Sequence, residues 1–108
     1  MKEYKVDIGK VKANISDSVI LKIELPIDKF SYDEVTEIVK MLQYKETVIL
    51  DSDCNEYKVI DKTLCVGHTD DYERFLVFDA AYISKDKIVK DVSVWIDKLG
   101  KSKLTIKL

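Results

Sequence analysis

The chain has 108 residues, 46% of them hydrophobic and 35% charged, and a formal net charge of −2. This length and composition suit one globular domain whose core needs neither disulfide nor metal cross-links. The charge lacks the basic excess of proteins that bind nucleic acid directly. Seventeen of the eighteen basic residues are lysine, which limits bidentate contacts to guanine and phosphate. No apolar run is long enough for a membrane span or a secretion signal, so we expect a cytoplasmic protein without membrane contact.

The first 25 residues alternate between apolar and polar side chains, as strands do. The apolar positions have one parity in residues 4–8 and the other in residues 11–15, with Gly9 between them. A glycine at such a change predicts a β-bulge that absorbs one extra residue. Residues 19–25 alternate again after a turn-forming segment. We therefore expect a hairpin over residues 3–25.

Residues 30–43 predict an α-helix. Ser31 and Glu34 have the spacing of a capping box, and Phe30 and Val35 have the spacing of a hydrophobic staple. The residues at helical spacing that form one apolar stripe are Val35, Ile38, Val39 and Leu42. Such a stripe indicates a helix that packs on a sheet.

The middle of the chain predicts further strands. Residues 47–50 form a short β-branched run, and residues 51–55 have the composition of a polar loop. Residues 57–60 and 64–66 are strand-like, and their alternation changes parity around Asp61-Lys62. Such a change indicates an irregularity between the two segments.

The C-terminal third predicts a strand, a helix and a strand. Residues 74–83, RFLVFDAAYI, are almost continuously apolar, which predicts a strand buried on both faces near the centre of the sheet. Residues 84–100 fit a helix better than a strand, with Ser84 at its start and Gly100 just after its end. Residues 104–108 alternate as a final strand.

No linker or repeat divides the chain, so residues 1–108 predict a single α+β domain. We expect a mostly antiparallel sheet with two helices packed on it, in the order ββαβββαβ.

The stretch LCVGHTDDYE, residues 64–73, gathers several residues capable of metal or nucleophilic chemistry. Cys65 and His68 have the spacing of one zinc-ligand pair, and Cys54 and Asp70 could complete a set of four. Standard zinc sites use a second closely spaced pair, which this set lacks. A small metalloprotein or enzyme that uses these four residues is therefore the alternative hypothesis.

A turn is the preferred interpretation of the same stretch. A cysteine nucleophile needs its thiolate, which the apolar and acidic surroundings of Cys65 disfavour. Turn chemistry instead predicts a connection between two strands over residues 67–71, with Gly67 at positive φ and Asp70 and Asp71 near the tip. We expect no catalytic residues here.

The segment DSDCNE, residues 51–56, begins like a calcium-binding loop because Asp51, Asp53 and Asn55 alternate. The match ends at Glu56, where such loops need glycine, and at Lys62, where they need a bidentate glutamate. We therefore expect a polar hairpin loop. The glycines are isolated, so no phosphate or dinucleotide motif is present and no cofactor is expected.

Acidic residues are concentrated in one part of the chain: residues 51–79 contain eight acidic and three basic side chains. An acidic surface of this kind can dock on a basic partner. The residues expected to form it are Asp51, Asp53, Asp70, Asp71 and Glu73. The sequence therefore predicts a small regulatory domain that binds a protein partner.

Two narrower hypotheses concern origin and assembly. Abundant Ile, Lys and Tyr with little Ala and Arg is typical of AT-rich genomes, including those of phages and mobile elements. An inhibitor of a host system is one class of regulator from such a source. A self-assembling virion or tail accessory protein is the third hypothesis, and the sequence leaves the oligomeric state open.

Overall fold

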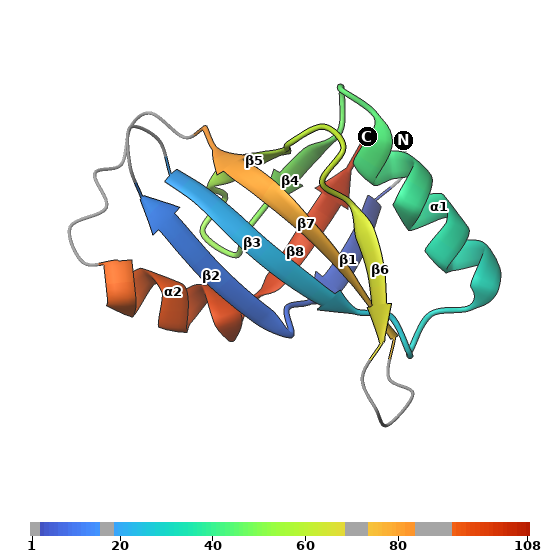
Figure 1. The fold of residues 1–108 in the computed structure, drawn as a ribbon, viewed down its shortest axis with the longest axis horizontal. Coiled ribbons are helices and arrows are strands. Elements are labelled where there is room, and N and C mark those ends of the chain that lie inside the picture. Colours follow the sequence, from blue (N-terminus) through green and yellow to red (C-terminus); the bar gives the residue numbers. More distant parts are fainter. Residues whose placement is uncertain (1–2, 16–18, 69–73, 84–91) are drawn as a thin grey trace.

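The structure is a computed structural model, and it describes residues 3–15, 19–68, 74–83 and 92–108 (Figure 1). In this part of the chain it has two helices and eight strands. In chain order these are β1 Glu3–Asp7, β2 Lys10–Ile15, β3 Val19–Pro26, α1 Tyr32–Gln43, β4 Val48–Leu50, β5 Glu56–Val59, β6 Cys65–His68, β7 Arg74–Tyr82, α2 Val92–Gly100 and β8 Lys103–Lys107. The predicted α+β class is confirmed, whereas the predicted order ββαβββαβ has two strands too few.

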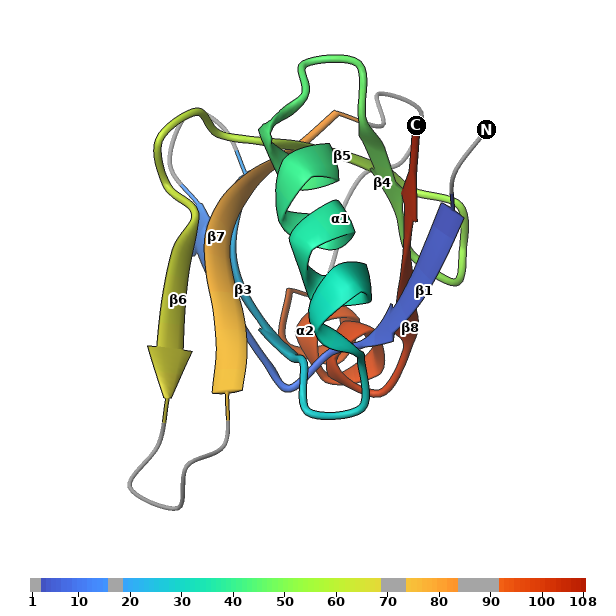
Figure 2. The ribbon, with the colours of Figure 1, turned by 90° about the vertical axis from the view of Figure 1, so that its right-hand side faces the viewer.

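The strands form one sheet in which every pairing is antiparallel. Its order is β1-β8-β4-β5-β7-β3-β2, and β6 pairs with β7 outside this path. Figure 2 shows the sheet bent into two walls, with β6, β7 and β3 on one side and β4, β8 and β1 on the other. Helix α1 stands between the walls, so both walls and the helix enclose one core.

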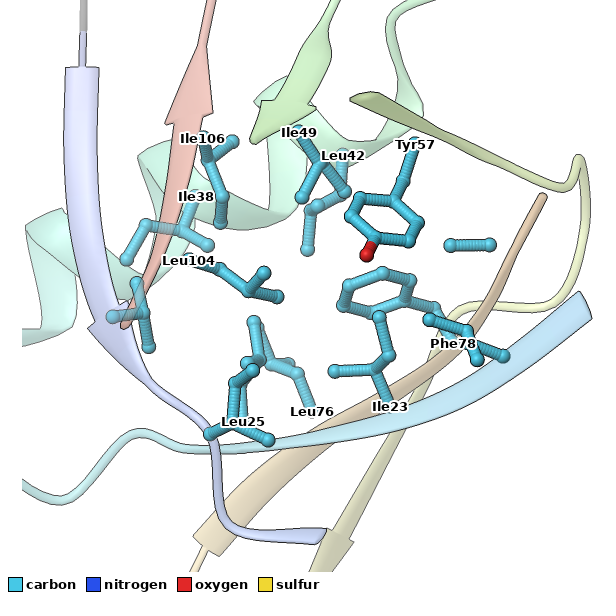
Figure 3. Close-up of a cluster of buried hydrophobic side chains, with 14 of the residues drawn as sticks. Ile23, Leu25, Ile38, Leu42, Ile49, Tyr57, Leu76, Phe78, Leu104 and Ile106 are labelled. Atoms are coloured by element: carbon cyan, nitrogen blue, oxygen red, sulfur yellow. The ribbon is translucent and has the colours of Figure 1, made fainter. Parts of the chain in front are cut away.

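The core is apolar and well covered. Figure 3 shows side chains from both walls and from α1 directed into the same space. Residues with no exposed surface in this cluster include Leu21, Ile23, Leu25, Ile38, Ile49, Leu76, Phe78, Leu104 and Ile106. Burial of each such side chain contributes about 1.5–3 kcal/mol relative to exposure. The core therefore fixes the bend of the sheet around α1.

The first strands differ from the prediction. Residues 3–25 do not form one hairpin with a bulge at Gly9, because β1 pairs with β8 and β2 pairs with β3. Gly9 lies where the chain passes from one wall to the other, and its N–H donates to the Glu24 carbonyl at 2.9 Å. Alternation alone could not distinguish a bulge from a change of partner strand.

Strand β7 has the predicted central position, since it pairs with β3, β5 and β6. It is not buried on both faces, however. Leu76, Phe78 and Ala80 face the core, whereas Phe75 and Val77 on the other face are half-buried. In the described ranges both helices pack into the core, on the inner face of the sheet. The outer face of this antiparallel wall is therefore partly open to water.

Both helix predictions are confirmed where the structure describes them. The Ser31 hydroxyl accepts from the Glu34 N–H at 3.2 Å, and a Glu34 carboxylate oxygen accepts from the Ser31 N–H at 3.0 Å. Helix α2 includes Gly100, which was expected just after the helix. The start predicted at Ser84 lies outside the described residues. Within those residues, no helix is both long and apolar enough to cross a membrane.

Candidate functional site

Strands β5 and β6 are two parts of one run that pairs with the same side of β7. Val59 pairs with Ala80, and Cys65 pairs with Val77. The chain therefore advances by six residues from β5 to β6 while the paired position on β7 moves by only three. The extra residues form a turn over 60–63, which confirms the predicted change of parity around Asp61-Lys62. The side chains at 64 and 66 therefore have the core-facing parity that Tyr57 and Val59 have in β5.

Thr63 fastens this turn to β7. Its hydroxyl donates to the Ile60 carbonyl at 2.7 Å and accepts from the Asp79 N–H at 3.0 Å. The Ile60 N–H in turn donates to the Asp79 carbonyl at 2.8 Å. These bonds replace the interrupted strand ladder, so the turn has a defined shape. Within it, Lys62 has a φ of 64°, a left-handed conformation that is uncommon for a residue with a side chain.

The turn leaves β6 at an edge of the sheet. Strand β4 pairs with β5 through Ile49 and Leu50, and in the described residues β6 pairs with β7 alone. Figure 2 shows β6 on the outside of the β7 wall. We call the unpaired side of Cys65–His68 the β6 edge. Its backbone N–H and C=O groups can accept a further strand.

The β6 edge lacks the features that usually prevent such pairing. The described residues leave two other edge strands: β1 contains Glu3, Lys5 and Asp7, and β2 contains Lys10 and Lys12. Charged side chains of this kind discourage a strand of another molecule from pairing. Strand β6 is Cys-Val-Gly-His, with no Lys, Arg, Asp, Glu or Pro, and its Val66 side chain is 67% exposed.

Gly67 has a different role from the one predicted. It lies within β6 rather than in a turn, and among the described glycines none has positive φ. Its partner across the strands is Phe75, whose ring covers the glycine: a Cβ atom built on Gly67 would lie 2.5 Å from Phe75 Cε2. Close approach of an aromatic ring, and not backbone conformation, favours glycine at this position.

A cavity of about 330 Å³ adjoins the start of β6. One side is the C-terminal end of α1 with the residues that follow, and the other side is the turn between β5 and β6. Figure 2 shows these two segments next to each other. The lining residues are Leu42, Gln43, Tyr44, Lys45, Val59, Ile60, Asp61, Lys62 and Leu64. Leu64 immediately precedes β6, so the cavity lies next to the start of the β6 edge.

The predicted acidic residue Asp51 is buried in the β4–β5 loop, where its carboxylate accepts four hydrogen bonds. Oδ1 accepts from the N–H groups of Asp53 and Asn55, both at 2.9 Å. Oδ2 accepts from Asn55 Nδ2 and from the Tyr57 hydroxyl, both at 2.8 Å. Both oxygens are thus occupied by donors of the chain itself, which is the arrangement of a polar hairpin loop and not of a calcium site.

The residues around Asp51 complete this loop. Asp53 forms an ion pair with Lys98 of α2 at 2.9 Å, and this hydrogen bond raises the pKa of the Lys98 ammonium. Cys54 has a φ of 63°, the left-handed conformation that ends a three-residue hairpin loop. Burial, followed by the hydrogen bond to Asp51, raises the pKa of the Tyr57 hydroxyl well above its ordinary value.

An aromatic group connects this loop to the C-terminal helix. The Tyr57 and Tyr82 rings lie 5.6 Å apart, and the Tyr82 and Trp95 rings lie 5.4 Å apart in an edge-to-face arrangement. This group could not be recognised in the sequence, because the three residues come from β5, β7 and α2. Only the pairing of Tyr57 with Tyr82 across the strands brings them together.

The described residues of the alternative metal site are not brought together. Cys54 lies near the Tyr82 end of β7, whereas Cys65 pairs with Val77, about 16 Å further along the strand at the usual rise per residue. Both thiols are free and exposed. In the described part of the chain no group of three His, Cys, Asp or Glu side chains could hold a metal ion. Asp70 lies outside the described residues.

The predicted acidic surface is described only in part. Asp51 and Asp53 lie near the Tyr82 end of β7, and His68 and Arg74, which bracket residues 69–73, pair at its other end. Asp70, Asp71 and Glu73 lie outside the described residues, so their role stays a prediction.

Comparison with known proteins adds no assignment: no family model, no curated protein and no solved structure matches the chain.

Proposed function

We propose that this protein is a protein-binding module that adds an extended segment of its partner to the β6 edge. The observation that carries the proposal is an edge strand with no charged residue and with an exposed valine. Addition of a strand to a sheet edge is a common mode of peptide recognition, because the backbone groups supply affinity and alternate side chains supply specificity. A domain of this kind would suit a regulator or inhibitor.

The sequence next to β6 favours a basic partner segment. The five residues that join His68 to Arg74 include Asp70, Asp71 and Glu73. Opposite charge in a partner would speed association and orient the bound strand. Asp51 does not contribute to this surface, because its carboxylate is buried and hydrogen-bonded within its own loop.

Affinity capture with matched variants tests this proposal. Val66→Lys introduces a charge on the β6 edge, and Val94→Lys introduces the same charge on α2, where the valine is similarly exposed (62%, against 67% for Val66). A specific partner should be retained by the native protein and by Val94→Lys, and lost with Val66→Lys. The double change Asp70→Lys/Asp71→Lys should weaken the same complex. Equal capture of that partner by every variant would contradict the proposal.

Self-assembly through the same edge is the competing outcome. Two copies of Cys65–His68 would share only a few backbone hydrogen bonds, each with a net contribution of about 1 kcal/mol. We therefore expect a monomer by size-exclusion chromatography with light scattering. A stable dimer that Val66→Lys dissociates would identify a second copy, rather than a different protein, as the occupant of the edge.

A further inference from the structure

The cavity beside β6 has the composition of a side-chain pocket. Its apolar walls come from Leu42 of α1, Val59 of β5 and Leu64, all of which belong to the core or pack against it. Charged residues, including Lys45 and Lys62, lie on its rim and are exposed. A volume of about 330 Å³ lies at the lower end of the range of ligand pockets, so the cavity has room for one large side chain.

The walls of the cavity are held in place. The Thr63 hydroxyl attaches the turn to β7 by accepting from the Asp79 N–H, and it closes the turn by donating to the Ile60 carbonyl. Leu42 anchors the end of α1 in the core with only 2% of its surface exposed. A pocket between two fixed segments does not have to be ordered when it is occupied. Preformed sites of this kind avoid part of the entropic cost of binding.

The register of β6 shows which side of an added strand would meet the cavity. Val66 pairs with Leu76, which is fully buried, so Val66 points to the core side of the sheet. Leu64 and His68 share that parity. An added strand also alternates, so every second side chain would lie on the core side, opposite Leu64, Val66 and His68 in turn.

We infer that this cavity is the specificity pocket of the β6 edge and takes one apolar side chain of the bound strand. The inference rests on the proposed function. The side chain opposite Leu64 enters the cavity, and the one opposite Val66 covers that exposed valine. The side chain opposite His68 lies at the end of β6 farthest from the cavity, where the described residues set no requirement for it.

These three positions define a recognition pattern with a direction. Every described pairing in this sheet is antiparallel, and antiparallel pairs are slightly more stable than parallel ones. An antiparallel partner runs from the His68 end of β6 toward the cavity. Its sequence, read from N- to C-terminus, is therefore two residues of any kind, a β-branched or other apolar residue, any residue, and a large apolar residue.

A pool of random heptapeptides, capped at both ends, tests the inference with the full chain as bait. The pattern above should be enriched among retained peptides, and the best of them should shift the amide resonances of Leu64–His68. Gln43→Trp, which places an indole at the cavity rim, should weaken that peptide about tenfold or more, the loss that corresponds to one buried apolar side chain. Lys40→Trp, one turn earlier on α1 and outside the cavity lining, should leave its affinity unchanged.

Three results would overturn the inference, and they separate its failure from that of the proposed function. If retained peptides shift β6 but show no preference for a large apolar residue, and Gln43→Trp binds them as well as the native protein, the edge binds and the cavity does not. A reversed pattern, with the large apolar residue before the β-branched one, would contradict the antiparallel assignment. If no peptide in the pool shifts β6, the proposed function fails together with the pocket.

Discussion

The hydrogen-bonded loop around Asp51 gives the sharpest test of how the described structure is stabilised. Asp51→Ala removes the acceptor of four hydrogen bonds while changing little apolar surface. The backbone N–H of Asp53 is only partly buried and can bond to water instead. Asn55 and Tyr57 cannot do so easily, because they are 5% and 0% exposed.

The expected magnitude follows from the donors left without partners. A buried polar group without a partner costs about 1–3 kcal/mol, and hydrogen bonds to a charged group contribute more than neutral ones. With Asn55 and the Tyr57 hydroxyl both affected, Asp51→Ala should lower the free energy of unfolding by about 3–5 kcal/mol. Tyr57→Phe removes one donor and leaves Asp51 three others, so it should cost about 1 kcal/mol.

Urea unfolding followed by Trp95 fluorescence measures both effects, because Trp95 lies against Tyr82 next to the loop. The double variant should be more stable than the sum of the single effects indicates, with a coupling of about 1–2 kcal/mol, since each change removes part of the same network. A loss below about 1 kcal/mol in Asp51→Ala, or strict additivity with Tyr57→Phe, would refute the argument that this buried carboxylate organises the loop.

Three further predictions concern single positions. Cys54→Gly should raise the free energy of unfolding by about 0.5–1 kcal/mol, because glycine adopts positive φ without the penalty that Cys54 carries, whereas Cys54→Val should lower it in the same urea assay. Gly67→Ala should cost about 1–3 kcal/mol through its contact with the Phe75 ring, and Phe75→Ala should remove most of that cost when the two are combined. Since burial and Asp51 raise the pKa of Tyr57, the folded chain holds this proton more tightly than the unfolded chain. Its contribution to stability is complete below pH 10 and declines above it, so the alkaline loss of stability should be shallower in Tyr57→Phe.

The elements predicted correctly are those that local signals specify. The capping box and apolar stripe of α1 lie within one segment, and so does the alternation that identifies β2 and β3. The change in the alternation of apolar side chains near Lys62 could also be predicted from the sequence, because it depends only on the spacing of neighbouring residues. Such signals act over a few residues and do not require knowledge of the partner strand.

The features that matter most for the proposed site depend on contacts between distant segments. Gly67 was expected to be a turn residue because glycine commonly is, and only the ring of Phe75 explains it. Asp51 was expected on an acidic surface, but the donors that surround it include Tyr57, which the loop brings back over the carboxylate. The open edge of β6 could not be predicted either, since it results from strand β4 ending beside β5.

The turn over residues 60–63 accounts for both parts of the proposed binding surface. It separates β5, which has β4 on its other side, from β6, which in the described residues pairs with β7 alone. The same residues form one wall of the cavity. Lys62 holds a left-handed conformation there although glycine would adopt it at lower cost. Local strain of this kind persists only where surrounding bonds enforce it, and it concentrates at functional sites. Here the Thr63 bonds enforce it, and its effect is to place a lysine on the rim of the cavity, beside the start of β6.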